Sequence, residues 1–160
     1  MTGKVCRFAL VFCAALPMSS RLGSAAVWYV KTAGSDALPG TSWALAKQSI
    51  TNSMVSANAG DQMWVASGIY TQLVTMKAGV ALYGGFNGTE TALAQRNWHT
   101  NLSWVYGAGQ GPSVTIPTGS GPDTRVDGMA ITAGGTSGGF GGGISCSGAG
   151  PVIANNFPDP

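Results

Sequence analysis

The carboxylates of this sequence are the side chains best suited to acid–base chemistry. Six of them follow residue 26: Asp36, Asp61, Glu90, Asp123, Asp127 and Asp159. A glycosidase needs two carboxyl groups that face one another across a sugar, yet no two of these residues lie two positions apart, as neighbours on one face of a strand would. Asp61 follows a glycine and Asp127 precedes one, which is typical of turns. We therefore expect no catalytic residue among them.

His99 and Cys146 are the other reactive side chains after residue 26. His99 is the single histidine of the chain and lies in a polar stretch beside Trp98. Without a second histidine or a cysteine cluster, the sequence lacks the ligand set of a zinc site. Cys146 would need a neighbouring base to act as a nucleophile, and its small neighbours favour a small residue on a strand. We expect no metal and no cofactor.

Two further stretches contain residue types that are common in binding sites. Residues 134–143 are rich in glycine, but no Gly-Lys-Ser/Thr sequence closes the run as in a phosphate-binding loop. The aspartate of calcium-binding glycine repeats is also missing, so we expect a corner or a loop. Asn155 and Asn156 could begin a ladder of stacked amides that hydrogen-bond along a fold axis, which would be a structural role.

The tryptophans could offer flat faces to a sugar. They are Trp28, Trp43, Trp64, Trp98 and Trp104. Most are expected to pack in the core or against its end. Trp98 is the best candidate for an exposed, sugar-stacking face because it lies in a long polar loop. The sequence identifies no other substrate-binding residue.

The first 26 residues are typical of a secretory signal peptide. Lys4 and Arg7 give a basic start, residues 8–18 form an apolar core, and small residues at 24–26 predict cleavage after Ala26. The alternative is a membrane anchor, which is disfavoured because the apolar run is shorter than the ~20 residues that span a bilayer. The mature protein is therefore expected to be secreted, at the outer membrane surface or in the periplasm.

The composition after cleavage excludes several classes of partner. Five basic and six acidic residues remain, a net charge of about −1, so no basic patch favours nucleic acid. We expect no transmembrane helix in the mature chain. With only 9% charged and 44% hydrophobic residues and 25 glycines, the sequence is typical of a secreted β protein rather than a disordered one. Loss of Cys6 and Cys13 leaves Cys146 alone, which excludes an internal disulfide.

Short apolar and aromatic runs bounded by glycine, asparagine or proline predict the strands. The predicted strands are residues 27–30, 62–66, 69–76, 80–83, 102–106, 113–116, 125–132 (interrupted at Asp127-Gly128), 144–146 and 152–154. Between them, a long loop is expected at residues 84–103.

One helix is predicted, from a cap at Thr41 or Ser42 to Ala57. Five apolar residues in this segment share one helical face: Trp43, Ala46, Ile50, Met54 and Ala57.

Residues 77–90 have a pattern that returns along the chain. A short apolar run is followed by glycines and an Asn-Gly turn, and similar versions lie at residues 125–135, 141–146 and 151–156. Four apolar residues are predicted to occupy corresponding points of successive coils, 17, 23 and 21 residues apart: Val65, Leu82, Val105 and Val126. These spacings are near the period of a β-solenoid, in which each coil stacks short parallel strands on the coil before.

Several short motifs occur in an order that is specific for one architecture. They are Tyr29-Val30, Gly34-Ser35-Asp36, Gly40-Thr41-Ser42-Trp43, Ala59-Gly60-Asp61, Trp64-Val65, Gly68-Ile69-Tyr70, Leu82-Tyr83-Gly84-Gly85-Phe86, Gly88-Thr89-Glu90, Arg96-Asn97, Val126-Asp127-Gly128, Gly141-Gly142-Gly143-Ile144 and Ile153-Ala154-Asn155-Asn156. On these motifs, residues 28–156 resemble the N-terminal part of a secreted bacterial right-handed parallel β-helix protein of the pectin-lyase-like superfold. The resemblance implies an all-β fold, a right-handed parallel β-helix (solenoid) with an N-terminal capping helix.

The resemblance divides the chain into a signal peptide at 1–26, an N-terminal strand and capping helix at 27–61, and the first coils of a parallel β-helix at 62–160. Nothing that resembles a second cap follows Asn156, so we expect a fold truncated at its C-terminus. An open strand edge there would favour edge-to-edge self-association.

This fold carries unrelated functions, so two hypotheses follow. The first is a secreted or cell-surface structural or adhesin-like module, without catalytic activity of its own, whose partner is a polysaccharide or cell-surface glycan. The alternative is the N-terminal part of a polysaccharide-active enzyme, a lyase or glycoside hydrolase, whose catalytic coils lie beyond this chain.

Overall fold

The fold is dominated by three parallel β-sheets. A computed structural model of the chain describes residues 24–132, 134–135 and 142–158. Sheet A has five strands in the order β1 (Val27–Val30), β2 (Gln62–Ala66), β5 (Ala81–Phe86), β8 (Arg125–Asp127) and β11 (Val152–Ala154). Every pairing between these strands is parallel, so the chain must leave sheet A and return between them.

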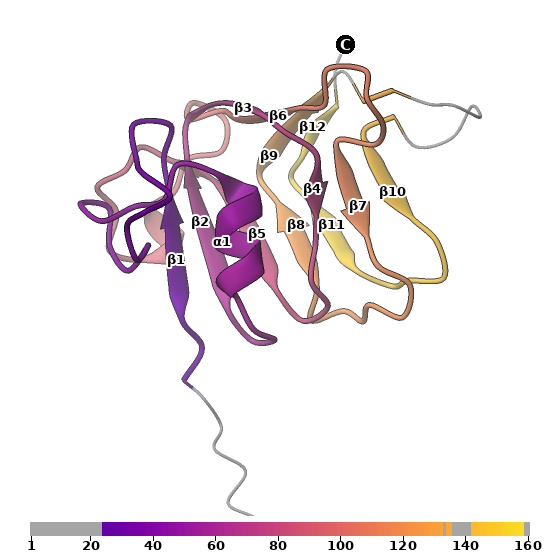
Figure 1. The fold of residues 1–160 in the computed structure, drawn as a ribbon, viewed down its shortest axis with the longest axis horizontal. Coiled ribbons are helices and arrows are strands. Elements are labelled where there is room, and N and C mark those ends of the chain that lie inside the picture. The colour runs from indigo at the N-terminus through magenta and orange to yellow at the C-terminus, as the bar shows by residue number, and fades with distance from the viewer. Residues whose placement is uncertain (1–23, 133, 136–141, 159–160) are drawn as a thin grey trace, which may run out of the picture.

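The chain leaves sheet A through two further parallel sheets. Sheet B contains β3 (Gly68–Thr71), β6 (Ser103–Tyr106), β9 (Met129–Thr132) and β12 (Phe157–Pro158). Sheet C contains β4 (Val74–Thr75), β7 (Val114–Ile116) and β10 (Ile144–Cys146). The chain passes through sheets A, B and C in that order three times, as β2-β3-β4, β5-β6-β7 and β8-β9-β10 (Figure 1).

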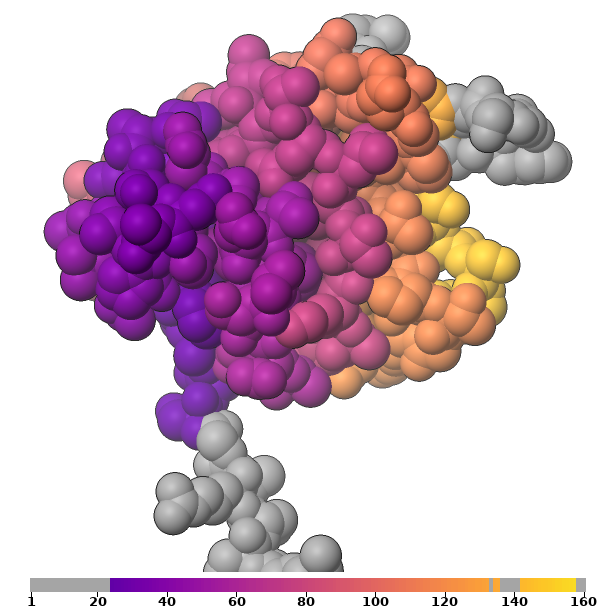
Figure 2. Space-filling view, viewed as in Figure 1, coloured from indigo at the N-terminus to yellow at the C-terminus, as the bar shows by residue number. Residues whose placement is uncertain are grey.

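Each passage forms one layer beside the previous one. In the space-filling view the chain colour advances along the long axis, from the N-terminal segment at one end to the strands of the third passage and β11 at the other (Figure 2). The register places Met63 beside Leu82 and Leu82 beside Val126 in sheet A. Apolar side chains of successive layers therefore stack on one another, and these stacks lie inside the fold.

The core consists of these inward-facing side chains. Tyr70, Val105 and Ile131 are register partners in sheet B, and all three are buried. Val74 pairs with Val114 in sheet C, where both are buried. Burial of each side chain of this size contributes roughly 1.5–3 kcal/mol, and the stacked rows make the core continuous across the layers.

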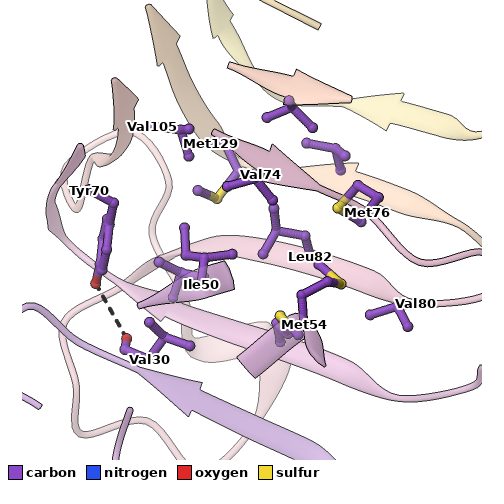
Figure 3. Close-up of a cluster of buried hydrophobic side chains, with 14 of the residues drawn as sticks. Val30, Ile50, Met54, Tyr70, Val74, Met76, Val80, Leu82, Val105 and Met129 are labelled. Carbon is purple, nitrogen blue, oxygen red and sulfur yellow. Dashed lines mark hydrogen bonds between the residues drawn. The ribbon is translucent and has the colours of Figure 1, made fainter. Parts of the chain in front are cut away.

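Tyr70 brings a polar atom into this core. Its hydroxyl donates to the backbone oxygen of Ala66 at 3.0 Å and contacts that of Val30 at 3.4 Å (Figure 3). Burial raises the pKa of Tyr70 above its ordinary value, so this side chain remains a neutral donor.

One α-helix, α1 (Ile50–Ser56), accompanies the sheets in the described part of the chain. Ser49 caps it by accepting from the backbone N–H of Asn52 at 3.2 Å, and Ile50, Ser53 and Met54 are buried. The helix lies beside β4 (Figure 1). No helix among residues 24–132, 134–135 and 142–158 is long and apolar enough to cross a membrane.

Hydrogen bonds from residues on both sides of β4 tie it to α1. The Thr51 hydroxyl donates to the Gln72 side chain at 2.6 Å. The Lys77 ammonium donates to the backbone oxygens of Val55 and Ala57 at 2.7 and 2.9 Å. The last of these contacts places a cation at the helix C-terminus, where it interacts favourably with the free carbonyls.

The predicted start of the helix at Thr41 or Ser42 is wrong. The backbone of Lys47 bonds to the strand β1, as acceptor from Lys31 at 3.0 Å and donor to Tyr29 at 2.9 Å. The carboxylate of Asp36 then accepts the N–H of Ser49 at 2.9 Å and fixes the turn into the helix. Because these backbone groups are used by β1 and the turn, the helix begins only at Ile50.

Most predicted strands are present, with four corrections. The predicted strand 69–76 is two strands in different sheets, because the chain turns between β3 and β4 at Gln72 and Leu73. The predicted interrupted strand 125–132 is likewise two strands, β8 in sheet A and β9 in sheet B. The expected loop 84–103 is shorter than predicted, since β5 extends to Phe86 and β6 begins at Ser103. The strand β12 was not predicted.

The spacing argument for the coils was also wrong in detail. Leu82 pairs with Met63 rather than with Val65, and Val105 belongs to sheet B, so the four points are not equivalent. The intervals between true register partners vary because the connections differ in length. Of the recurring stretches, residues 77–90, 125–135 and 151–156 do stack in sheet A, whereas the strand after residue 141 lies in sheet C.

Candidate functional site

One connection between sheets A and B differs from the others. Ser67 alone joins β2 to β3, and Gly128 alone joins β8 to β9. Residues 87–102, which we name the corner loop, join β5 to β6. A long insertion at one corner of otherwise repeating layers is a common place for a binding site. The corner loop is therefore the candidate site.

Glu90 organises the first turn of the corner loop. Its buried carboxylate accepts backbone N–H groups from Asn87 at 2.7 Å, Gly88 at 3.0 Å and Thr89 at 3.0 Å. Its backbone oxygen accepts from the indole N–H of Trp43 at 2.8 Å. Both carboxylate oxygens are therefore bonded to the turn, which Glu90 holds together.

The carboxamides of the corner loop have a fixed orientation. The side-chain oxygen of Asn87 accepts the N–H of Thr89 at 3.0 Å, and that of Asn97 accepts the N–H of His99 at 3.2 Å. The side-chain oxygen of Gln95 accepts the N–H of Thr91 at 2.7 Å. Because a backbone N–H can only donate, the oxygen must occupy each of these positions.

The opposite ends of these three carboxamides are free. The side-chain NH2 groups of Asn87, Gln95 and Asn97 have no hydrogen-bond partner in the described part of the chain. Asn101 is oriented the other way, because its NH2 donates to the Gly85 oxygen at 3.3 Å. The corner loop thus presents three amide donors and one free amide oxygen.

These groups line a pocket of about 490 Å³. Its lining residues are all polar: Asn87, Thr89, Glu90, Thr91, Gln95, Asn97, Thr100 and Asn101. Pockets for apolar ligands are lined mainly by hydrophobic side chains. This lining instead suits a small polar ligand with many hydrogen-bonding oxygens.

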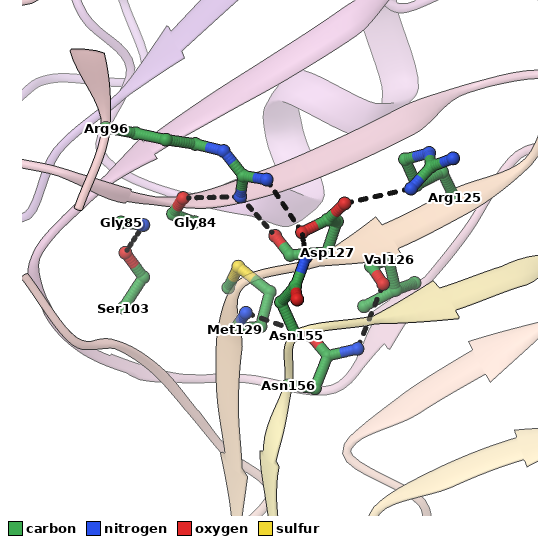
Figure 4. Close-up of polar contacts among 10 residues, drawn as sticks. All are labelled: Gly84, Gly85, Arg96, Ser103, Arg125, Val126, Asp127, Met129, Asn155 and Asn156. Atoms are coloured by element: carbon green, nitrogen blue, oxygen red, sulfur yellow. Dashed lines mark hydrogen bonds and ion pairs between the residues drawn. The ribbon is translucent and has the colours of Figure 1, made fainter. Parts of the chain in front are cut away.

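Gly85 anchors the corner loop to sheet A. Its backbone oxygen accepts the N–H of Asn97 at 2.7 Å, and its N–H donates to the Ser103 hydroxyl at 3.1 Å (Figure 4). A Cβ at Gly85 would lie 2.7 Å from the backbone of Trp98, and its φ of 94° is in the left-handed region. Only glycine allows this close approach without strain.

Arg96 anchors the same loop to the next layer. Its guanidinium forms an ion pair with Asp127 at 2.7 Å and donates to the Gly84 oxygen at 3.2 Å (Figure 4). It also lies over the Tyr83 ring, 5.1 Å from the ring centre, which is a cation–π geometry. One side chain therefore fixes the loop to both β5 and β8.

Asp127 is the centre of this network. Besides Arg96, its buried carboxylate accepts from Arg125 at 2.9 Å and from the Asn155 amide at 2.9 Å. Burial alone would raise the pKa of Asp127, but the bonds from Asn155 and the two arginines lower it below its ordinary value. The charged carboxylate is thus stable at neutral pH. The predicted interruption of the strand is present, but Asp127 is the last residue of β8 and Gly128 alone forms the corner.

The predicted asparagine ladder is replaced by mixed pairs. Asn155 bonds to Asp127, whereas the Asn156 side chain accepts the N–H of Met129 at 2.9 Å and donates to the Val126 oxygen at 2.9 Å (Figure 4). Both asparagines therefore connect β11 to the preceding layer, but their partners are a carboxylate and backbone groups because no asparagine stands at the equivalent corner of that layer.

Trp98 and His99 lie on the corner loop but do not line its pocket. Their rings are 3.6 Å apart, and the Phe157 ring lies 5.6 Å from that of Trp98. Trp98 is half-buried and His99 is exposed. The sugar-stacking role of Trp98 stays a prediction, and the rings of His99 and Phe157 already lie beside its ring.

The other predicted candidates are dispersed. Asp61 accepts from Trp28 at 3.0 Å and from the N–H of Asn58 at 2.9 Å, which confirms its turn role. Asp123 is exposed and unbonded within the described residues. Cys146 lies exposed on β10, as predicted for a strand residue.

Two of the aromatic candidates, Trp43 and Trp64, belong to a cluster of rings instead of an open face. Trp64 stacks on Phe86 at 4.7 Å, and Tyr29 and Trp43 lie edge to face at 4.9 Å. Trp104 is half-buried on β6. Asp159 and most of residues 134–143 lie outside the described residues.

The described residues contain no group of three or more histidine, cysteine, aspartate or glutamate side chains that could hold a metal ion. The sequence predicts a long polar loop around Trp98 but not the carboxamide pocket within it. The available signal was the spacing of asparagine and glutamine in one long loop.

Comparison of the chain with protein-family models, with curated proteins and with solved structures finds no match.

Proposed function

We propose that this chain is a segment of a right-handed parallel β-helix that acts as a secreted or cell-surface structural or adhesin-like module. The repeated passage through sheets A, B and C supports the solenoid. The position of α1 beside β4, where another strand of sheet C would otherwise pair, supports its role as a cap. The basic start and apolar run of residues 1–26 support export.

One observation supports the proposal that this module is not catalytic: its buried carboxylates are already hydrogen-bonded within the protein. Asp61, Glu90 and Asp127 each accept three or more hydrogen bonds from protein donors. A general acid or base must exchange a proton with substrate, and the oxygens of these three carboxylates are already bonded to donors of the protein. The free groups of the corner loop are neutral amides, which suit binding rather than proton transfer.

The test is incubation of the exported protein with a panel of acidic and neutral polysaccharides. We expect no new reducing ends and no unsaturated products, and an N-terminus at Val27 in the exported chain. Turnover that is lost in Asp123→Asn, the variant of the exposed carboxylate, would overturn the proposal and favour a polysaccharide-active enzyme. Retention of residues 1–26 on the mature chain would overturn its export.

A further inference from the structure

We infer that the signal peptide is cut between Ala25 and Ala26, and that the new α-ammonium group of Ala26 forms an ion pair with the carboxylate of Asp61. This inference rests on the proposed export of the chain and names the processing site. It makes Ala26, in place of Val27, the expected first residue of the mature protein. It follows from the hydrogen bonds of Ala26, the surroundings of Asp61 and the geometry of the strand β1.

The sequence allows two positions for the cut. A signal peptidase recognises small residues one and three positions before the bond that it hydrolyses. Ser24 and Ala26 meet this requirement for a cut after Ala26. Gly23 and Ala25 meet it for a cut one residue earlier. Residue types therefore do not separate the two positions, whereas the contacts of the fold do.

Ala26 is the first residue that the fold holds. Its backbone oxygen accepts the N–H of Gln62 at 2.8 Å, and its N–H donates to Oδ1 of Asp61 at 2.8 Å. Within the described part of the chain, neither Ser24 nor Ala25 makes a hydrogen bond. A cut after Ala26 would remove both bonds, whereas a cut before it removes none.

The carboxylate of Asp61 is buried without a counter-charge. Its Oδ2 accepts from the Trp28 indole at 3.0 Å and from the N–H of Asn58 at 2.9 Å. Its Oδ1 has the N–H of Ala26 as its one partner among the described residues. No lysine, arginine or histidine of that part of the chain forms an ion pair with it, whereas Asp127 has two arginines. Buried carboxylates are usually paired, so a cation is expected here.

The cut before Ala26 supplies this cation at the position of a neutral donor. Hydrolysis adds the hydroxyl of water to the carbonyl carbon of Ala25 and its hydrogen to the nitrogen of Ala26. An α-amino group ordinarily has a pKa of about 8, so it takes up a further proton from solvent at neutral pH. Burial alone would raise the pKa of Asp61, but hydrogen bonds from the Trp28 indole and two backbone N–H groups lower it. Both groups are therefore charged, and such a bond is stronger than a neutral one.

A cut after Ala26 would place the new charge on the wrong side of β1. In a parallel pair, alternate residues of a strand direct their N–H groups to the same neighbour. The N–H of Tyr29 donates to the Gly40 oxygen at 2.8 Å, on the side of β1 away from β2. Val27 lies two residues before Tyr29, so its nitrogen also points away from β2. An ammonium group at Val27 would leave Asp61 without a cation and with one donor fewer.

The test of the processing site is the intact mass of the protein exported by a bacterial host from the full sequence. We expect Ala26 as the first residue. Ala25→Leu puts a large residue directly before the inferred bond, so this product should be lost. Ala26→Leu is the matched control, because it blocks the alternative cut but should still be processed before residue 26. Both side chains are exposed, so neither change disturbs the core.

The test of the ion pair is an NMR titration of the exported protein, followed at the methyl group of Ala26. We expect the pKa of its α-amino group to lie above the ordinary value of about 8, because the charge of Asp61 stabilises the ammonium form. Asp61→Asn should return it to that value, while Asp123→Asn, at an exposed carboxylate, should leave it as in the wild type. If Asp61→Asn does not fold, the wild-type value still decides.

Three results would overturn the inference: any first residue other than Ala26, loss of processing in Ala26→Leu but not in Ala25→Leu, or an α-amino pKa that is not raised in the wild type. These failures are separate from failure of the proposed function. A chain that begins at Val27 is still exported, whereas retention of residues 1–26 contradicts the export itself.

Discussion

Replacing Asp127 with asparagine is expected to lower the free energy of unfolding by about 3 kcal/mol, because removing one partner of a buried ion pair leaves the other without compensation. Arg96 is the partner most affected, since its side chain is only 12% exposed. Arg125 is more exposed and should lose less, as surface pairs contribute little. Urea denaturation of wild type and Asp127→Asn measures the difference.

The matched control is Asp123→Asn, which makes the same chemical change four residues earlier at an exposed site. It should change the free energy of unfolding by less than about 0.5 kcal/mol. Equal stability of the two variants would contradict the role of Asp127 as the centre of the network.

The same network makes the free energy of unfolding depend on pH in the acidic range. Burial alone would raise the pKa of Asp127, but hydrogen bonds from Asn155, Arg96 and Arg125 lower it below 3.8. A carboxyl with a depressed folded-state pKa stabilises fully above its unfolded pKa and loses that contribution as pH falls through the folded pKa. Wild type should therefore lose stability below about pH 4, and Asp127→Asn should lose less over that range.

Replacing Gly85 with alanine is the second large effect we expect. The new Cβ would lie 2.7 Å from the backbone of Trp98, so the corner loop must move away from β5. Gly88→Ala is the matched control, because Gly88 has a similar φ of 100° but nothing within 4 Å of an added Cβ. Gly85→Ala should be less stable than Gly88→Ala by about 1–3 kcal/mol, the usual cost of overpacking.

The comparison separates backbone strain from the steric clash. Both variants place alanine in the left-handed region, so this cost is common to them. Thermal denaturation of the two proteins under the same conditions therefore measures the cost of the steric clash alone. Equal melting temperatures of the two variants would contradict the close contact between Gly85 and the corner loop.

Local signals predicted the strands well and the helix start poorly. β1 and β2 were predicted to the residue, because apolar runs there are bounded by turn residues. The helix was extended to Thr41 because Trp43 and Ala46 continue its apolar face. Long-range contacts keep these residues out of the helix, because Lys47 pairs with β1 and Trp43 bonds to Glu90. Neither contact has a signature in the local sequence.

The site was harder to predict than the sheets. That residues 87–102 form a long polar loop is visible in the sequence, and Asp61 was placed correctly in a turn, whereas Asp127 ends the strand β8. The direction of each carboxamide is not visible, because it depends on which backbone N–H groups the fold brings to its oxygen. The pairing of Arg96 with Asp127 joins two layers. It was not predictable because the number of residues between equivalent positions of successive layers is irregular.

Amide hydrogen exchange across residues 87–102 tests the central claim, that this loop is a pre-organised site and not an ordinary flexible connection. The N–H groups of Asn87, Gly88 and Thr89 bond to Glu90, and that of Asn97 bonds to Gly85. We predict that these amides exchange far more slowly than those of an unstructured peptide, at rates closer to those of the neighbouring strands. Exchange of all four at peptide rates, with β5 and β6 still protected, would contradict the account.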